Sequence, residues 1–288
     1  MHDEARPPVW VLLRGLTRES GHWGDFPLKL LRALRPGQPG VRLELLDLPG
    51  NGHLHRQSSP SSVTAMREAC QQELLRRGVL PPYNLLAMSL GAMVASDWAA
   101  HHPEDLESVV LINTSLRPFS PFFRRLRPAN YWTLLALSLF RLSLRQREAR
   151  VLAMTTRLVP KPEQVLDQWV DLQQRHPVRR RNALRQLLAA VRYRASGARP
   201  RPPMLLLCSR RDELVDWRCS QAISRAWGVP LRMHPEAGHD LPLDDGDWVA
   251  WSVTDWVRER GLIEQITHPM GLDPLPAAGA AEQPMRPS

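Results

Sequence analysis

Short apolar runs alternate with amphipathic stretches over most of this chain, and that alternation constrains the fold more than any other feature. The runs are mostly apolar on both faces and end at turn residues, as strands do when helices cover both sides of a sheet. Six runs are expected to be strands: 9–13, 41–47, 83–88, 108–113, 203–209 and 231–234. Amphipathic stretches with a helical repeat lie between them at 25–34, 63–77, 90–101, 216–227 and 247–260. Because strands separated by helices form parallel βαβ units, the sequence predicts an α/β fold with a doubly wound, mostly parallel sheet.

The stretch 115–201 breaks this alternation, because it contains no convincing strand pattern. Its helical patterns lie at 131–144, 163–174 and 182–193. We therefore predict a helical cap inserted at 115–201 into a core domain formed by 1–114 and 202–265. The last segment, 266–288, is rich in Pro, Ala and Gly and has almost no periodic apolar pattern. That composition predicts a disordered tail.

The charge of the chain is unevenly distributed. The formal net charge is +9, and almost all of the positive charge is arginine. The predicted insertion holds about 19 Arg and Lys residues against about 4 Asp and Glu residues, so the rest of the chain is net acidic. A basic surface suits nucleic acid, an acidic lipid surface or an anionic substrate, but it is also a common solvated surface. No zinc-ligand spacing or recognition motif indicates nucleic acid, and we predict no nucleic-acid partner.

The cysteines and the N-terminus bear on the compartment. Cys70, Cys208 and Cys219 form no CxxC pair, which predicts neither a disulfide framework nor a zinc site. The first residues are acidic and lack the charge pattern of a signal peptide, and no apolar run approaches the ~18 residues that span a bilayer. We expect a cytoplasmic protein with no integral membrane span. The sequence leaves the oligomeric state unknown.

One serine lies where a nucleophile is expected. The segment Ala87-Met88-Ser89-Leu90-Gly91 follows a predicted strand and opens a predicted helix. A nucleophile elbow needs small residues two positions before and after the serine, so that strand and helix can approach closely. Ala87 and Gly91 meet that requirement and indicate Ser89 as a nucleophile. The alternative is a serine that caps an ordinary helix.

An acid and a histidine follow Ser89 in the order typical of this kind of site. Asp212 comes directly after the run 203–209, and His239 lies in a glycine-containing loop before the last predicted helix. In a catalytic triad His239 would take the serine proton and Asp212 would orient the imidazole. The alternatives are a helix cap for Asp212 and a surface loop for His239. Asp216 is a reserve candidate for the acid, although capping the following helix suits it better.

The tetrahedral intermediate of such a reaction needs hydrogen-bond donors for its oxyanion. We predict that the backbone N–H of Leu90, at the start of a helix, is one donor. The other is expected in the loop after the first strand, at the N–H of Leu16. Four side chains are candidate members of the substrate pocket: Trp23, Met88, Phe122 and Trp132. The alternatives are packing at a helix start for Trp23, core packing at a strand end for Met88, and the insertion's own core for Phe122 and Trp132.

With these motifs the chain resembles the serine hydrolases of the α/β-hydrolase fold that carry a helical cap, such as capped esterases and lipases. The matching motifs are Leu13-Arg14-Gly15-Leu16, Asp47-Leu48-Pro49-Gly50-Asn51-Gly52, the Ser89 elbow, the Asp212 segment and Gly238-His239. In this family a histidine usually precedes the oxyanion-loop glycine, where this chain has Arg14. A serine at position 89, rather than an aspartate, argues against the dehalogenase and epoxide hydrolase branches. The resemblance implies hydrolysis of an ester or a related acyl bond, with no metal and no cofactor.

The resulting hypothesis is a serine hydrolase that cleaves carboxylic esters of small or medium apolar acyl groups. Its partner would be a small-molecule acyl ester, attacked through a Ser-His-Asp triad and an acyl-enzyme. The basic insertion leaves other reactions open on the same scaffold: thioester hydrolysis, acyl transfer or C–C bond cleavage. A non-catalytic binding protein with this fold is the remaining alternative.

Overall fold

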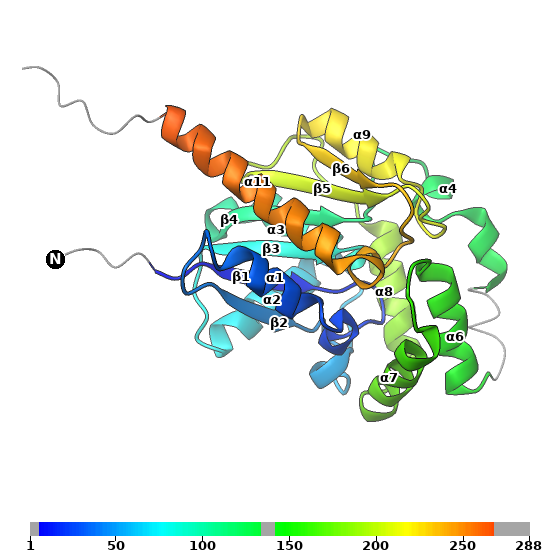
Figure 1. Cartoon of the computed structure of the whole chain (residues 1–288). Coiled ribbons are helices and arrows are strands. Elements are labelled where there is room, and N and C mark those ends of the chain that lie inside the picture. The colour runs from blue at the N-terminus through cyan, green and yellow to red at the C-terminus, as the bar shows by residue number, and fades with distance from the viewer. Residues whose placement is uncertain (1–5, 134–141, 268–288) are drawn as a thin grey trace, which may run out of the picture.

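The computed structural model describes residues 6–133 and 142–267, and its centre is one parallel sheet (Figure 1). The strand order is β2-β1-β3-β4-β5-β6, and every neighbouring pair is parallel. The strands are β1 (Val9–Leu13), β2 (Arg42–Leu46), β3 (Tyr83–Met88), β4 (Leu106–Ile112), β5 (Met204–Ser209) and β6 (Leu231–His234). This is the predicted doubly wound α/β sheet.

Helices cover both faces of the sheet. On one face, α1 (Phe26–Leu34) packs against α11 (Gly246–Thr267), with the short α10 (Leu241–Asp244) before it. On the other face lie α2 (Val63–Arg76), α3 (Leu90–His101) and α9 (Arg218–Trp227). Successive residues of a strand point to opposite faces. In β1, Trp10 and Leu12 accordingly join the apolar cluster under α1 and α11, whereas Val11 and Leu13 join the cluster under α2 and α3.

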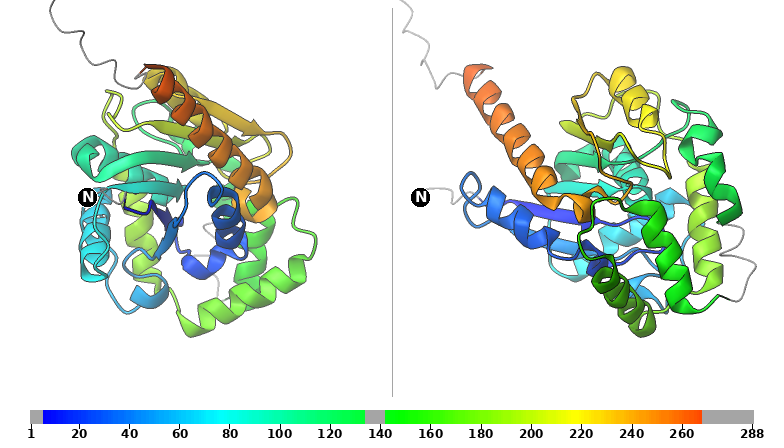
Figure 2. Two further views of the ribbon diagram at one scale, coloured as in Figure 1. Left: turned by 60° about the vertical axis from the view of Figure 1, so that its left-hand side comes forward. Right: turned by 45° about the vertical axis from the view of Figure 1, so that its right-hand side comes forward.

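The chain between β4 and β5 is helical where the structure describes it. It contains α4 (Phe122–Arg125), the 3-10 turn η4 (Pro128–Asn130), α6 (Leu144–Thr155), α7 (Pro162–Arg175) and α8 (Arg180–Arg192). These helices lie together beside the carboxyl ends of the strands (Figure 2). They occupy the segment 115–201 that we predict to be a cap, and α6 is a helix that the sequence patterns did not indicate.

Two predicted segments lie mostly outside the described residues. The predicted helix 131–144 falls mostly on residues 134–141, which are not described. Most of the predicted tail 266–288 also lies outside the described part of the chain, although α11 continues to Thr267.

Candidate active site

Ser89 lies in a strained turn between β3 and α3. Its backbone angles are φ 55° and ψ −116°, a conformation that residues other than glycine rarely adopt. A Cβ at Gly91 would lie 2.5 Å from the carbonyl oxygen of Arg14, so only glycine lets α3 approach the end of β1 this closely. A Cβ at Gly15 would lie 3.1 Å from the Ser89 Cβ. The loop after β1 is therefore packed against the serine.

Asp212 and His239 are hydrogen-bonded to each other. The Nδ1 atom of His239 lies 2.7 Å from Oδ2 of Asp212, and both residues are buried. The other oxygen of Asp212 accepts hydrogen bonds from the backbone N–H groups of Leu214 and Val215, at 2.8 and 2.9 Å. The turn after β5 thus fixes one carboxylate oxygen and leaves the second for the imidazole.

Asp216, the reserve candidate for the acid, has other partners. Its carboxylate accepts hydrogen bonds from the backbone N–H of Arg218 at 2.9 Å and from the guanidinium of Arg218 at 3.2 Å. These contacts lie at the start of α9. The structure therefore brings Asp212, and not Asp216, to His239.

Asn113 helps to position the candidate site, a role that the sequence did not reveal. It follows β4 with a φ of 46°, and its side-chain amide donates hydrogen bonds to the carbonyl of His239 at 2.7 Å and to Ser209 Oγ at 3.0 Å. Its side-chain oxygen accepts from the Ser209 N–H at 2.8 Å. Next to it, the Thr114 hydroxyl donates to the carbonyl of Ser89 at 3.2 Å. The residues after β4 therefore bind both the loop that contains His239 and the turn that contains Ser89. The available signal was a polar residue at the carboxyl end of an apolar strand.

A buried ion pair joins the loop after β1 to the histidine loop. The Arg14 guanidinium donates to both carboxylate oxygens of Asp240, at 2.9 and 2.5 Å. Their side chains are 2% and 3% exposed. Arg14 also lies over the Trp23 ring, 4.7 Å from its centroid, and contacts the sulfur of Met88 at 3.5 Å. The sequence signal for this contact was Arg14 itself, at a position where the family that the chain resembles usually has histidine.

The predicted oxyanion donors lie at the loop after β1 and at the first residue of α3. Leu90 begins α3, where backbone N–H groups lack acceptors within the helix. Leu16 follows Gly15, which packs against Ser89. The loop continues through Thr17, with a φ of 57°, whose N–H donates to the side chain of Gln186 in α8 at 2.8 Å. The donor roles of Leu16 and Leu90 stay predictions.

The four candidate pocket residues divide into two pairs. Trp23 and Met88 are buried and belong to the apolar cluster beneath α1 and α11. Phe122 and Trp132 are exposed, by 72% and 79%. A role for any of the four in substrate binding stays a prediction.

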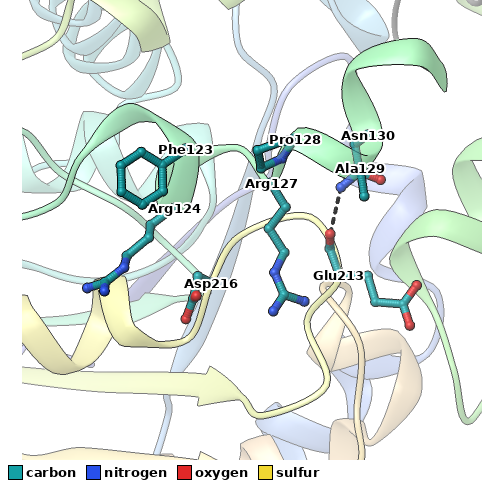
Figure 3. Close-up of a pocket in the computed structure, with 8 residues that line it drawn as sticks. All are labelled: Phe123, Arg124, Arg127, Pro128, Ala129, Asn130, Glu213 and Asp216. Carbon is teal, nitrogen blue, oxygen red and sulfur yellow. Dashed lines mark hydrogen bonds between the residues drawn. The ribbon is translucent and has the colours of Figure 1, made fainter.

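A cavity of about 490 Å³ lies between the α4–η4 segment and the loop after β5 (Figure 3). Two hydrogen bonds attach this segment to the loop after β5. Arg127 donates to the carbonyl of Asp212 at 3.0 Å, and Asn130 donates to the carbonyl of Glu213 at 2.6 Å. None of the three predicted triad residues lines the cavity, which is formed by Phe123, Arg124, Arg127, Pro128, Ala129, Asn130, Glu213 and Asp216. The cavity therefore lies next to the loop after β5, and Ser89, the predicted nucleophile, does not line it.

Among residues 6–133 and 142–267, no group of three or more His, Cys, Asp and Glu side chains is placed to hold a metal ion.

Comparison with known proteins identifies the family to which this chain belongs. The model of the alpha/beta hydrolase family matches residues 10–251, so the chain belongs to that family and is a hydrolase. The chain is 28% identical over 229 residues to a protein of Cronobacter turicensis named "Putative carbamate hydrolase RutD", covering 76% of this chain and 79% of that protein.

Solved structures agree with the family at the level of the fold. A hydrolase from Pseudomonas aeruginosa superposes with a TM-score of 0.70 at 20% identity, over 88% of this chain and 91% of that one. The enol-lactonase from Burkholderia xenovorans gives a TM-score of 0.71 at 16% identity, over 89% and 94%. An esterase from Thermogutta terrifontis gives 0.66 at 17% identity, over 88% and 90%.

Proposed function

We propose that this hydrolase cleaves carboxylic esters through a triad of Ser89, His239 and Asp212. The observation that carries the proposal is the buried hydrogen bond of 2.7 Å between His239 and Asp212, at the sheet edge where Ser89 takes its strained conformation. The carboxyl ends of β3 and β5 lie at that same edge because the sheet is parallel. A serine elbow, an acid and a histidine in this chain order are typical of acyl-enzyme chemistry on this fold.

The reaction begins with attack of Ser89 Oγ on the substrate carbonyl, while His239 Nε2 accepts the hydroxyl proton. Asp212 keeps the proton of His239 on Nδ1 and stabilises the imidazolium that forms. The oxyanion receives hydrogen bonds from the N–H groups of Leu16 and Leu90, each worth about 3–4 kcal/mol in the transition state. His239 then protonates the leaving alcohol, and the bond between the carbonyl carbon and the alcohol oxygen breaks.

Water completes the cycle by the same route. His239 removes a proton from a water molecule, whose oxygen attacks the acyl carbon bound to Ser89. Collapse of the second tetrahedral intermediate releases the carboxylic acid and returns the proton to Ser89 Oγ. The two halves use the same donors, because both pass through an oxyanion on the same carbonyl oxygen.

The leaving group is the part of the substrate with the most alternatives. Carbamates, lactones and esters all present a carbonyl bonded to a leaving heteroatom, so the carbamate-hydrolase name of the 28%-identical relative makes a carbamate the second candidate. Thioesters, acyl transfer and C–C cleavage remain alternatives because of the basic insertion. We favour esters of small or medium apolar acyl groups as the first substrates to try.

Labelling with a fluorophosphonate probe tests the nucleophile. Wild-type protein should be labelled at Ser89, as located by peptide mass spectrometry, and Ser89→Ala should not be labelled. Ser96, buried in α3 and hydrogen-bonded to the carbonyl of Ala92, offers a matched control, and Ser96→Ala should label like the wild type. Absence of labelling in folded wild-type protein would refute the serine mechanism.

A substrate panel then tests the bond that is cleaved. We expect p-nitrophenyl esters from acetate to octanoate to be turned over, and aryl carbamates and acyl-CoA thioesters to react more slowly. Faster turnover of a carbamate of matched leaving group would replace the ester proposal with the second candidate, while leaving the role of Ser89 intact.

A further inference from the structure

The polarity of α8 is the reverse of that in an ordinary surface helix. Its buried residues are Asn182, Gln186 and Ala189. Four apolar side chains face outward, and we call them the α8 stripe: Leu184 (58% exposed), Leu187 (38%), Leu188 (38%) and Val191 (56%). Their spacing of i, i+3, i+4 and i+7 forms one continuous face, of the kind that a surface helix normally turns toward the core.

Hydrogen bonds to the core hold α8 in this orientation. Gln186 donates to Asn51 at 2.8 Å and to Ser59 Oγ at 3.0 Å, and it accepts from the N–H of Thr17. Asn182 accepts from the N–H of Ser59 at 3.0 Å. A rotation of α8 that buried the stripe would break these bonds and leave buried polar groups without partners. The stripe is therefore held at the surface.

The charged residues in the stretch of sequence around the stripe have one sign. Between Asp171 and Asp212 the chain has no Asp or Glu, and its arginines include Arg179, Arg180, Arg181 and Arg192 on or beside α8. All four are exposed. The stripe is thus an apolar strip bordered by cations, with no acidic neighbour in sequence.

The helix α4 lies beside α8. The Arg125 guanidinium of α4 donates to the carbonyl of Ala190 in α8 at 2.7 Å, which places the two helices side by side at the outer edge of the insertion (Figure 2, right). The exposed ring of Phe122 belongs to α4, and the exposed ring of Trp132 follows η4 in the same insertion. Helices that lie in a membrane interface combine arginine with leucine, phenylalanine and tryptophan.

A second copy of the chain is a poor occupant for this face. In a two-fold dimer the same patch meets itself. The arginines beside α8 would then face one another, with no acidic residue of that stretch to pair with them. An anionic lipid surface instead attracts the arginines, and it can take the stripe into the boundary between headgroups and acyl chains.

We propose that the α8 stripe and its flanking arginines dock this protein on the surface of a bilayer that contains anionic lipid. Within the described residues, no helix is long and apolar enough to cross a membrane. The docking does not depend on the triad, and Ser89→Ala is expected to bind vesicles as well as wild-type protein.

The test is co-sedimentation of the whole chain with vesicles of phosphatidylcholine and phosphatidylglycerol, and with vesicles of phosphatidylcholine alone. We expect binding only to the anionic vesicles, weakening as salt is added. The double variant L184Q/V191Q should bind about tenfold more weakly or worse, because it removes apolar side chains from the buried contact. The matched control is L28Q/L75Q, since Leu28 in α1 and Leu75 in α2 are each 58% exposed and lie outside the insertion. That control should bind like the wild type.

Several results would overturn the proposal. Equal binding to neutral vesicles would remove the role of the arginines, and unchanged binding of L184Q/V191Q would remove the role of the stripe. A dimer in sedimentation velocity that L184Q/V191Q converts to a monomer would assign the stripe to a second copy. Binding to polyglutamate with no binding to anionic vesicles would assign it to an acidic protein.

Discussion

The carboxyl edge of the sheet and the outer surface of α8 arrange polar and apolar side chains in opposite ways. At the edge, Arg14 pairs with Asp240 and His239 with Asp212, and all four residues are buried. On α8, the hydrogen-bonding side chains face the core and the α8 stripe faces outward. Charged groups at the edge have no solvent to replace a lost partner, whereas the stripe contacts solvent already.

The difference predicts a gradient of mutational effects. Removing one partner of a buried charged pair leaves the other unpaired in a region of low dielectric. Such a change is among the single substitutions that lower the free energy of unfolding most. Removing a neutral hydrogen bond at the junction between α8 and the core should cost less. A substitution on the outer surface of α8 should change binding rather than folding.

The largest effect is expected at the proposed triad. Asp212→Asn should lower kcat about 10⁴-fold, because an amide cannot hold the proton of His239 on Nδ1. The side-chain oxygen that accepts from the Leu214 and Val215 N–H groups is retained, so the loop should keep its shape. Steady-state kinetics on an ester substrate measure the loss. Asp216→Asn is the matched control and should keep most of the activity; equal losses in the two variants would contradict the assignment.

The buried pair of Arg14 and Asp240 should have the largest effect on stability. Arg14→Met should lower the free energy of unfolding by about 3–5 kcal/mol, because Asp240 is left as an unpaired buried carboxylate. Urea titration followed by tryptophan fluorescence measures the change. In the double variant Arg14→Met/Asp240→Leu both charges are gone, and part of the lost stability should return. A double variant as unstable as the two single losses added together would show that the two side chains do not act as a pair.

The sequence predicted the sheet and the helices between β4 and β5 with different success. All six strands were located to within two residues, because burial on both faces produces a strong apolar pattern. The chain order of Ser89, Asp212 and His239 indicated a catalytic triad, which stays a prediction, and the structure places His239 and Asp212 within hydrogen-bond distance. Asn113 and His239 are 126 positions apart in the chain, and Arg14 and Asp240 are 226 positions apart. A local pattern contains no information about such contacts.

The insertion shows a different limit. The helical repeat at 182–193 located α8 (Arg180–Arg192) well, but periodicity does not determine which face of a helix is buried. That choice depends on Gln186 and Asn182, whose partners Asn51 and Ser59 lie far away in the sequence. In α7, by contrast, Leu166 and Trp169 are buried with Leu152 of α6, as an ordinary amphipathic helix requires.

The junction of α8 with the core should show an intermediate effect. Gln186→Leu should lower the free energy of unfolding by about 1–3 kcal/mol, since Asn51, Ser59 and the Thr17 N–H lose their partner. Its neighbour Leu187 is partly exposed, and Leu187→Gln should change stability by less than about 0.5 kcal/mol. Urea titration of both variants measures the difference. Equal stabilities would mean that α8 is held by something other than these hydrogen bonds.

The smallest effect is expected from protonation of His22, which follows the loop after β1 and contacts Trp169 of α7. Burial, followed by the charges of Arg18 and Arg14, holds the pKa of His22 well below its usual value of about 6.5. Arg18 in turn pairs with Glu148 of α6 at 2.6 Å. The folded protein therefore keeps His22 neutral at a pH where the unfolded chain binds a proton. The resulting stability is complete above pH ~6.5 and declines as the pH falls below it, by at most about 1.4 kcal/mol per pH unit. His22→Gln should flatten this decline in urea titrations between pH 8 and pH 5.5, and the pH 8 value corrects for any pH-independent effect of the substitution. If the variant declines as steeply as the wild type, protons bind elsewhere, and the surroundings of His22 do not differ from the outer surface in their response to acid.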